Sequence, residues 1–475
     1  MNANDIISDL EDIVDCKKIR TGESLNALNP GMTEKNLDAG IVVSPETVAE
    51  VAKVVKFCKA RGIQIIPQGG RTGISGAAES SPGQLIIQSS ALDQIINLDF
   101  VAGTAIVESG VTLQQLQDAI EPYGFGVGID LAARGTATIG GMVSTNAGGT
   151  EAFRYGVTRH RVLGLEAVLA DGEIFSDMKE VTKANEGYDI KQLLIGAEGT
   201  LGIITKVVLN LVPLDKNRFT ALLSCENAVS AATVFQSLRN DSRATLLCAE
   251  IMWPDYANTT ARALGMENLL DFAHSEKDVF VIIDISCAEN KAGVDVLEEI
   301  LSELLSRESI TSALIAQNQR EATDFWKIRE ESFLCDKAYP HGFWYDMSVP
   351  LSHLDDYTTA LYETIASIDS ELKVFLFGHL GDGNLHLTVT SGIEAPQLES
   401  QINVAVYEGL NDIGGSFSAE HGIGNQKRDS LQKYTNSQKM KIMKSVKNIL
   451  DPQGIMNPGK IFQPEEGPEL MAALR

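Results

Sequence analysis

The stretch GHLGDGNLH at residues 378–386 carries two of the chain's seven histidines, His379 and His386. Apolar, β-prone runs precede and follow it, so the two histidines are predicted to flank a tight turn between strands. Imidazole nitrogens are common ligands of zinc and similar divalent ions. Glu420, in the later stretch SAEHGIG, would complete a three-ligand site with an open position, which suits catalysis. The alternative interpretation is that both histidines hydrogen-bond the backbone of the turn and strand.

The composition limits the class of protein. The formal net charge of -25 argues against a nucleic-acid partner and against an anionic membrane. The six cysteines are dispersed without a Cys-x-x-Cys pair, which argues against an iron–sulfur cluster and fits a reducing compartment. The N-terminal residues lack the apolar core of a secretory signal, and no apolar run has the length of a membrane span. We therefore expect a cytoplasmic protein of two or three domains that is not an integral membrane protein.

A glycine-rich loop follows the first predicted strand–helix–strand unit. The helix has a predicted N-cap at Ser44 and a stop at Gly62, which is typical of an α/β domain. The second strand runs into PQGGRTGISGAA at residues 67–78, where bare backbone can approach a pyrophosphate and Thr72 and Ser75 can add hydroxyl donors. The loop is neither a Walker A motif nor the Gly-x-Gly-x-x-Gly fingerprint, so it predicts another phosphate-bearing cofactor.

Two further glycine-dense stretches follow at residues 135–149 and 196–204. Small residues at this density indicate close backbone packing or close approach to a ligand. Together with the first loop, they are interpreted as the walls of one elongated cofactor site. Asp171-Gly172 between two β-prone runs predicts a hairpin, and the polar break at residues 213–218 predicts a domain boundary.

Beyond that boundary, predicted helices and strands alternate, which indicates a second domain of α/β or α+β class around one sheet. Arg329 lies there in a partly apolar helix. Its default interpretation is a solvated surface charge. If it faces a pocket instead, it would be a bidentate clamp for a carboxylate.

These motifs resemble, in order, those of the flavin-dependent 2-hydroxy-acid dehydrogenases of the vanillyl-alcohol-oxidase type. This group includes D-2-hydroxyglutarate and D-lactate dehydrogenases and a glycolate oxidase subunit. The resemblance covers nearly the whole chain, from around residue 39 to Phe462, and rests on six motifs. They are the loop at 67–78, TIGG with NAGG within 138–149, GAEGTLG at 196–202, GHLGDGNLH at 378–386, AEHGIG at 419–424 and DPQGIMNPGK at 451–460.

The resemblance implies an α+β fold. Its first part is a PCMH-type FAD-binding domain made of two α/β subdomains. A substrate-binding cap domain follows, with an antiparallel sheet flanked by helices, and a C-terminal helical segment returns to the FAD domain. On this pattern the chain divides into a helical lead-in at 1–38, the FAD domain at 39–216, the cap domain at 217–425 and the C-terminal segment at 426–475.

The resemblance also implies FAD as the cofactor, with its diphosphate over residues 69–76 of the first loop. Relatives with covalent flavin carry a linking histidine or cysteine, which this loop lacks, so non-covalent FAD is expected. Yellow colour that stays on the acid-precipitated protein would refute this expectation. The residues expected to bind FAD are Pro67, Gln68, Gly69, Gly70, Arg71, Thr72, Gly73, Ser75, Gly76, Ala77, Gly135, Thr138, Gly140, Gly141, Asn146, Gly148, Gly149, Glu198, Gly199, Gly202, Ile203 and Asn457.

In the family pattern, His379, His386 and Glu420 would bind a divalent metal, zinc or else manganese. His421 would be the catalytic base, and Arg329 would grip the substrate carboxylate. The metal would favour the alkoxide of a 2-hydroxy acid, His421 would take the hydroxyl proton, and the C2 hydride would pass to flavin N5. The expected activity is the FAD-dependent oxidation of a D-2-hydroxy acid to the 2-keto acid.

Two substrate-binding positions depart from the pattern expected of the hydroxyglutarate enzymes. Trp344 stands where a lysine is expected, and Thr388 stands where an asparagine is expected, two residues after His386. The loss of a cation leaves a distal substrate carboxylate without its partner, which is costly in a buried site. The substrate is therefore expected to have a less polar tail than hydroxyglutarate, or to be shorter, as lactate is.

Two other functions compete with this one. An alkyl transferase resembling the ether-lipid synthase would have the same fold, but the C-terminal Ala-Leu-Arg is not a peroxisomal address. A flavin-free metal hydrolase built on the histidines would leave the glycine-rich loops unexplained. The sequence shows no second redox centre, so electrons are expected to leave to a partner such as an electron-transfer flavoprotein or a quinone. Family members suggest a homodimer.

Overall fold

The computed structural model describes residues 3–215, 217–287 and 293–463. These fold into two compact units, the first from residues 1–149, 155–214 and 420–475 and the second from residues 150–154 and 215–419. The units divide after residues 214 and 419, where the sequence predicted boundaries after 216 and 425. The stretches predicted as a separate lead-in and C-terminal segment both belong to the first unit, and residues 464–475 of the latter lie outside the described residues.

A four-stranded sheet in the first unit carries the first glycine-rich loop after its strand β3. The order is β1-β2-β4-β3, with β1 antiparallel to β2 and the other pairs parallel. The cap of the helix after β2 is Thr47, three residues later than the predicted Ser44, because the Thr47 hydroxyl accepts the Glu50 amide. Gly62 ends the helix as predicted. The elements are α1 (Ala3–Glu11), β1 (Ile19–Thr21), β2 (Ile41–Val43), α2 (Val48–Arg61), β3 (Ile65–Gln68) and β4 (Leu85–Gln88).

The first unit also contains a five-stranded antiparallel sheet, ordered β5-β6-β10-β8-β9. The predicted hairpin at Asp171-Gly172 is confirmed, since β8 pairs with β9. One core joins this sheet to α3 and α4, and it holds the second glycine-rich stretch against the strands. The strands are β5 (Ile95–Asp99), β6 (Thr104–Glu108), β8 (Val162–Leu169), β9 (Ile174–Asp177) and β10 (Gly202–Asn210), with a small pair of β7 (Phe125–Gly126) and β11 (Val212–Pro213). The helices along this stretch of chain are α3 (Leu113–Ile120), α4 (Ile139–Thr145), α5 (Ala152–Tyr155), α6 (Thr158–Arg161) and α7 (Lys191–Leu194).

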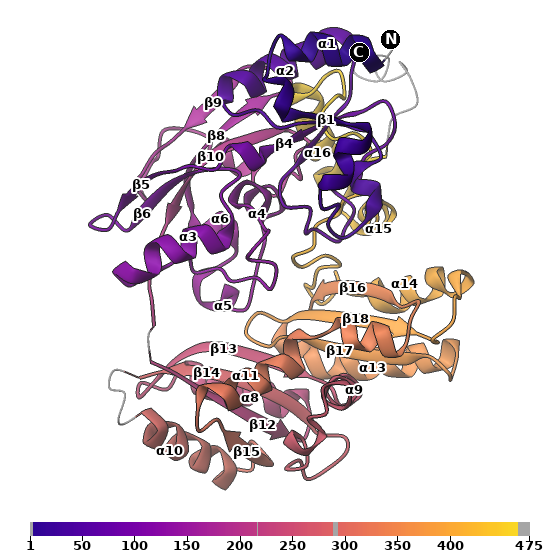
Figure 1. The fold of residues 1–475 in the computed structure, drawn as a ribbon. Coiled ribbons are helices and arrows are strands. Elements are labelled where there is room, and N and C mark those ends of the chain that lie inside the picture. Colours follow the sequence, from indigo (N-terminus) through magenta and orange to yellow (C-terminus); the bar gives the residue numbers. More distant parts are fainter. Residues whose placement is uncertain (1–2, 216, 288–292, 464–475) are drawn as a thin grey trace. The chain divides into compact units, whose positions relative to one another are not determined.

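The second unit is built on a seven-stranded sheet ordered β15-β12-β14-β13-β17-β18-β16, with every pair antiparallel (Figure 1). This confirms the predicted antiparallel sheet. His379 ends β17 and His386 lies in β18, on either side of the predicted turn. The strands are β12 (Arg218–Cys225), β13 (Thr245–Met252), β14 (Val279–Ser286), β15 (Ser312–Ile315), β16 (Phe343–Ser348), β17 (Lys373–His379) and β18 (Asn384–Thr390). The helices are α8 (Ala228–Arg239), α9 (Pro254–Leu264), α10 (Gly293–Ser306), α11 (Gln319–Glu330), α12 (Phe333–Ala338), α13 (Leu354–Ile368) and α14 (Glu399–Tyr407).

The C-terminal helices α15 (Arg428–Tyr434) and α16 (Ser437–Leu450) return to the first unit, as predicted. Val446 and Leu450 of α16 pack against the core of the five-stranded sheet. Of the helices in the described part of the chain, none has both the length and the apolar character that crossing a membrane requires.

A lysine on the inner side of α16 ties this helix to the rest of the unit. Lys447 Nζ donates to the carbonyl oxygens of Thr200 and Met456, each at 2.8 Å, and to Asp451 at 2.6 Å. Asp451 also accepts the amides of Ile455 and Met456. Burial lowers the pKa of Lys447, and the Asp451 carboxylate opposes that shift.

The Lys447→Ala substitution is expected to lower the free energy of unfolding of the first unit by about 3 kcal/mol, because it leaves the buried Asp451 without its cation. Denaturant unfolding followed by circular dichroism measures this loss. The matched control is Lys444→Ala one turn earlier, whose side chain is exposed, and it should change stability by less than about 0.5 kcal/mol. Equal losses in the two variants would contradict a stabilising role for the buried pair.

Candidate functional site

A cavity of about 330 Å³ in the first unit is lined by parts of all three glycine-rich stretches. These are the loop after β3, helix α4 with the residues before it, and the turn before β10. Stretches predicted to form the walls of one site therefore do line one cavity. The predicted site residues on the lining are Pro67, Gln68, Gly69, Gly70, Arg71, Thr72, Gly73, Ala77, Thr138, Gly140, Gly141, Gly148, Glu198, Gly199, Ile203, Glu420 and His421.

The first loop presents consecutive backbone donors to this cavity. Arg71 has a left-handed conformation with φ of 56°, which curls the loop. Among the described residues, no protein acceptor is found for the amides from Gly70 to Gly73. Successive amides in such a curled backbone form a concave set of donors that binds anions. The residues present therefore fit a diphosphate-bearing cofactor such as FAD.

Bare backbone is a steric requirement at several positions on the lining, of which Gly70 and Gly140 are the clearest. A Cβ added to Gly70 would collide with the carbonyl oxygen of Thr136, and one added to Gly140 would collide with Ser109. A Cβ added to Gly135 would meet open space, and this residue lies off the lining. Close packing around the cavity therefore explains Gly70 and Gly140, but it does not explain Gly135.

Several residues predicted to bind FAD lie off the lining and shape the walls from behind. Asn146 ends α4 with φ of 54°, and its Oδ1 accepts the Arg159 amide at 2.9 Å. Asn457 donates through Nδ2 to the carbonyl oxygens of Ala77 and Glu198. The predicted residues off the lining are Ser75, Gly76, Gly135, Asn146, Gly149, Gly202 and Asn457.

Sequence reasoning missed other lining residues, because they lie outside glycine-rich motifs. Ser109 has the clearest structural signal, since its Oγ is buried without a hydrogen-bond partner among the described residues. Such a group is expected to find a partner in a bound ligand or water. Five of these missed residues are Ser89, Ser109, Leu131, Ala132 and Ala133.

Glu198 fixes the segment that follows His421. Its buried carboxylate accepts the amide of Ile423 at 2.6 Å and that of Gly424 at 2.7 Å. Burial raises the pKa of Glu198, and the two amide hydrogen bonds oppose this shift. Because the two amides lie two and three residues after His421, this carboxylate restrains the backbone that carries the predicted base.

The two histidines of the β17–β18 turn face each other. The Nε2 atoms of His379 and His386 are 3.4 Å apart, and the ring planes are close to perpendicular. Two imidazole nitrogens bound at about 2.1 Å to one tetrahedral ion would lie about 3.4 Å apart. The pair therefore has the spacing of two ligands of one divalent ion.

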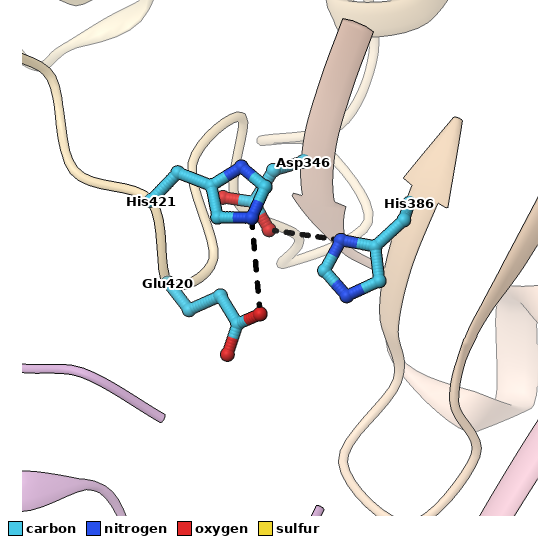
Figure 2. Close-up of side chains that lie close together, drawn as sticks. All are labelled: Asp346, His386, Glu420 and His421. Carbon is cyan, nitrogen blue, oxygen red and sulfur yellow. Dashed lines mark ion pairs between the residues drawn. The ribbon is translucent and has the colours of Figure 1, made fainter. Parts of the chain in front are cut away.

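Asp346 joins His386 at a group of four side chains that could hold a metal ion (Figure 2). It lies opposite His386 in the neighbouring strand, and its Oδ1 is 3.9 Å from the Nδ1 of that ring. Its Oδ2 accepts the amide of Ala419, the residue before Glu420. Potential ligand atoms of Asp346, His386, Glu420 and His421 all lie within 4.8 Å of one another. Imidazole and carboxylate ligands suit zinc and manganese.

This group shares His386 and Glu420 with the predicted metal ligands. The third predicted ligand, His379, lies beside His386 rather than in the group itself, and Asp346 and His421, the predicted base, are the other members. Asp346 was not predicted, although a charged residue inside the β-prone run FWYDMS was a signal. A charge in a buried strand needs a compensating partner, and such partners are often functional.

Arg329 is not the solvated charge of its default interpretation. It is buried in α11, its Nη2 lies 2.6 Å from Glu250 Oε2, and its guanidinium lies over the Phe377 ring at 4.6 Å. The prediction was a clamp for a substrate carboxylate. The carboxylate that Arg329 contacts in the structure is that of Glu250.

Trp344 and Thr388 lie opposite each other, next to the pair of Asp346 and His386 along the same two strands. Alternate residues of a strand point to the same face, so these four side chains share one face of the sheet. The rings of Trp344 and Phe333 meet edge to face with centroids 5.9 Å apart, and both are about half exposed. An aromatic surface therefore lies about 7 Å, one strand repeat, from the potential metal ligands.

Comparisons with known proteins agree with both units. The family model for the C-terminal domain of FAD linked oxidases matches residues 214–461, and the model for an FAD binding domain matches residues 39–177. The chain is 33% identical over 422 residues to the mitochondrial D-2-hydroxyglutarate dehydrogenase of Bos taurus, covering 89% of this chain and 76% of that protein. It is 29% identical to the D-2-hydroxyglutarate dehydrogenase of Stutzerimonas stutzeri, covering 96% of this chain and 98% of that protein.

Solved structures show the same fold at lower sequence identity. One of p-cresol methylhydroxylase has a TM-score of 0.72 and 17% identity, with 97% of each chain covered. One of alkyldihydroxyacetonephosphate synthase has a TM-score of 0.71 and 15% identity, with 96% of this chain and 85% of that chain covered. At these identities the likeness establishes the fold alone, and it confirms the predicted α+β class.

A Gly70→Ala substitution is expected to abolish FAD retention, because the added methyl displaces the loop that presents the amides. Flavin absorbance per protein after gel filtration measures it. The matched control is Gly135→Ala, which has room for the methyl and lies off the lining. It should retain FAD like the unaltered protein. Full retention by the Gly70→Ala variant would remove this loop from the FAD site.

Proposed function

Because the chain belongs to the family of FAD-linked oxidases, we propose that it oxidises a D-2-hydroxy acid to the corresponding 2-keto acid. One observation carries the proposal: Glu420 and His421 line the glycine-walled cavity and also belong to the group of potential metal ligands. The redox cofactor and the charged groups that bind and deprotonate a hydroxy acid would thus share two neighbouring residues. The dehydrogenase names of the curated relatives support the same reaction.

Each part of the reaction has residues suited to it. FAD, when bound, supplies an acceptor for the hydride that leaves C2. A divalent ion, when bound, supplies positive charge that favours the alkoxide form of the hydroxyl group. His386 and Glu420 would hold that ion, with Asp346 or His379 beside them. The Gly70–Gly73 amides would hold the cofactor's diphosphate.

His421 is the proposed base. It takes the hydroxyl proton, the C2 hydride leaves with its electron pair, and a carbonyl forms at C2, so atoms and electrons balance. Its ring is partly exposed, with Nε2 3.8 Å from Glu420 Oε1. Restraint of the following backbone by Glu198 would keep the ring close to one orientation.

The proposed substrate has an apolar or short tail. Trp344 and Phe333 offer aromatic surface beside the proposed metal ligands, where a substrate tail would lie. Neither side chain can neutralise a second carboxylate. A second carboxylate that loses part of its water against these rings, without a cation, would be disfavoured. We therefore assign this chain a less polar substrate than the hydroxyglutarate in the names of its relatives, and an electron-accepting partner such as an electron-transfer flavoprotein or a quinone.

Anaerobic titration of the FAD-loaded, metal-replete protein with D- and L-2-hydroxy acids tests the reaction. One D-acid is expected to reduce the flavin and bleach its visible absorbance band, while its enantiomer does not. His421→Asn should retain FAD but slow bleaching by at least about 100-fold, because it removes the base. A flavin that no acid reduces would contradict the dehydrogenase proposal and favour the transferase.

The tail preference is tested by Trp344→Lys. The new cation is expected to raise kcat/KM for D-2-hydroxyglutarate about tenfold relative to an apolar D-acid, since a charge-assisted hydrogen bond contributes about 1.5 kcal/mol or more. Asp336, which now accepts the Trp344 Nε1 proton at 2.9 Å, could compete for that lysine. The substitution is therefore made with and without Asp336→Asn. Trp344→Leu is the control for loss of the ring, and equal preferences of the leucine and lysine variants would contradict the proposal.

A further inference from the structure

A buried carboxylate stands behind the histidine pair. Glu250 of β13 is fully buried and lies opposite His379 of β17 in the sheet. Its Oε1 is 2.8 Å from His379 Nδ1, and its Oε2 is 2.6 Å from Arg329 Nη2. All three residues belong to the second unit, and the sequence motifs did not include Glu250.

The Glu250 contact selects one tautomer of His379. A carboxylate accepts hydrogen bonds, so the Nδ1 beside it carries the proton and the lone pair is left on Nε2. That Nε2 is the atom that faces His386 Nε2 at 3.4 Å. Metal-binding histidines commonly have such a carboxylate on the ring nitrogen away from the ion, which orients the ring and raises its basicity as a ligand.

Arg329 completes the arrangement. Its side chain is 8% exposed, and its guanidinium lies over Phe377, which stacks in turn on Tyr256 with centroids 4.2 Å apart. The Tyr256 hydroxyl donates to the Arg329 carbonyl oxygen at 2.7 Å. The arginine is thus held by packing and by its own backbone. A buried carboxylate without a cation would be costly, and Arg329 supplies that cation.

We propose that Glu250 is a positioning residue that makes His379 a metal ligand through Nε2, with Arg329 as its counter-ion. The inference rests on the proposed metal in the function above. It assigns Arg329 to the support of a ligand, and it makes His379 the partner of His386 Nε2 in binding the ion. The ion would then have two imidazole ligands, His379 and His386, while His421 stays the proposed base.

The experiment measures zinc affinity of the FAD-loaded, metal-stripped protein by competition with a chromogenic chelator. His379→Ala and His386→Ala each test the metal site itself and are expected to weaken zinc binding strongly. Glu250→Gln keeps an acceptor oxygen but loses the charge, and it is expected to weaken zinc binding about 10- to 100-fold. If the histidine variants bind zinc like the unaltered protein, the metal in the proposed function fails.

If the histidine variants lose zinc while Glu250→Gln binds it normally, the positioning role is overturned and the metal site stands. The matched control is Asp284→Asn, another buried carboxylate of the same sheet, which pairs with Arg218 and Thr220 instead of a histidine. It should lower stability without changing zinc affinity. Weakening by Asp284→Asn equal to that by Glu250→Gln would also overturn the role.

A double variant covers the case in which Glu250→Gln does not fold because Arg329 is left unpaired. Glu250→Gln with Arg329→Gln replaces the ion pair by two neutral amides and should fold, yet still bind zinc about 10- to 100-fold less tightly. Nitrogen-15 NMR of histidine-labelled, metal-free protein gives a second readout. The His379 ring should be protonated on Nδ1, and a ring protonated on Nε2 would contradict the inference.

Discussion

The burial of charge is the physical constraint on which both parts of the candidate site depend. Glu198, Glu250 and Asp346 are each 5% exposed or less, and a buried carboxylate is tolerated only where donors replace its water. Those donors come from segments distant in the sequence, either backbone amides or the side chains of a histidine and an arginine. The hydrogen bonds to each carboxylate therefore fix a segment that contains or adjoins a proposed catalytic or metal-binding residue. Two of the three hold the backbone on either side of Glu420 and His421.

The cofactor cavity depends on the opposite property, the absence of side chains. The first loop can present successive amides because Gly70 and its neighbours leave the backbone bare, and because Arg71 takes a left-handed conformation. That conformation costs a non-glycine residue about 1 kcal/mol or more. The Arg71 side chain offsets the cost, since Nε donates to the Asn29 carbonyl oxygen and Nη1 donates to Gln68. An arginine is therefore used where glycine would be the simpler choice, and it ties the loop to the N-terminal segment.

Local sequence patterns predicted the loops and turns. They did not predict which residues from distant strands contact the site residues. The glycine density at residues 67–78 and 135–149 predicted a cavity wall, and the short turn between His379 and His386 brought those two rings together within one hairpin. Glu250 comes from a strand more than a hundred residues earlier, and its pairing with β17 follows from the strand order of a seven-stranded sheet. No periodicity in either strand specifies that order. Asp346 was missed for the same reason, because its importance lies in the strand and the segment that it meets.

Two residues of the second unit depart from what the family pattern implies, one in its contact and one in its type. Arg329 was expected to meet a substrate carboxylate, yet a protein carboxylate already lies 2.6 Å from it. Trp344 stands where a lysine was expected and gives its ring to an aromatic pair with Phe333. Neither position, on different elements of the second unit, offers the proposed substrate the cation that the family pattern implied. In the proposed function, a divalent ion bound at the metal group would supply the positive charge for the substrate, which suits an acid whose only carboxylate is the one beside its hydroxyl group.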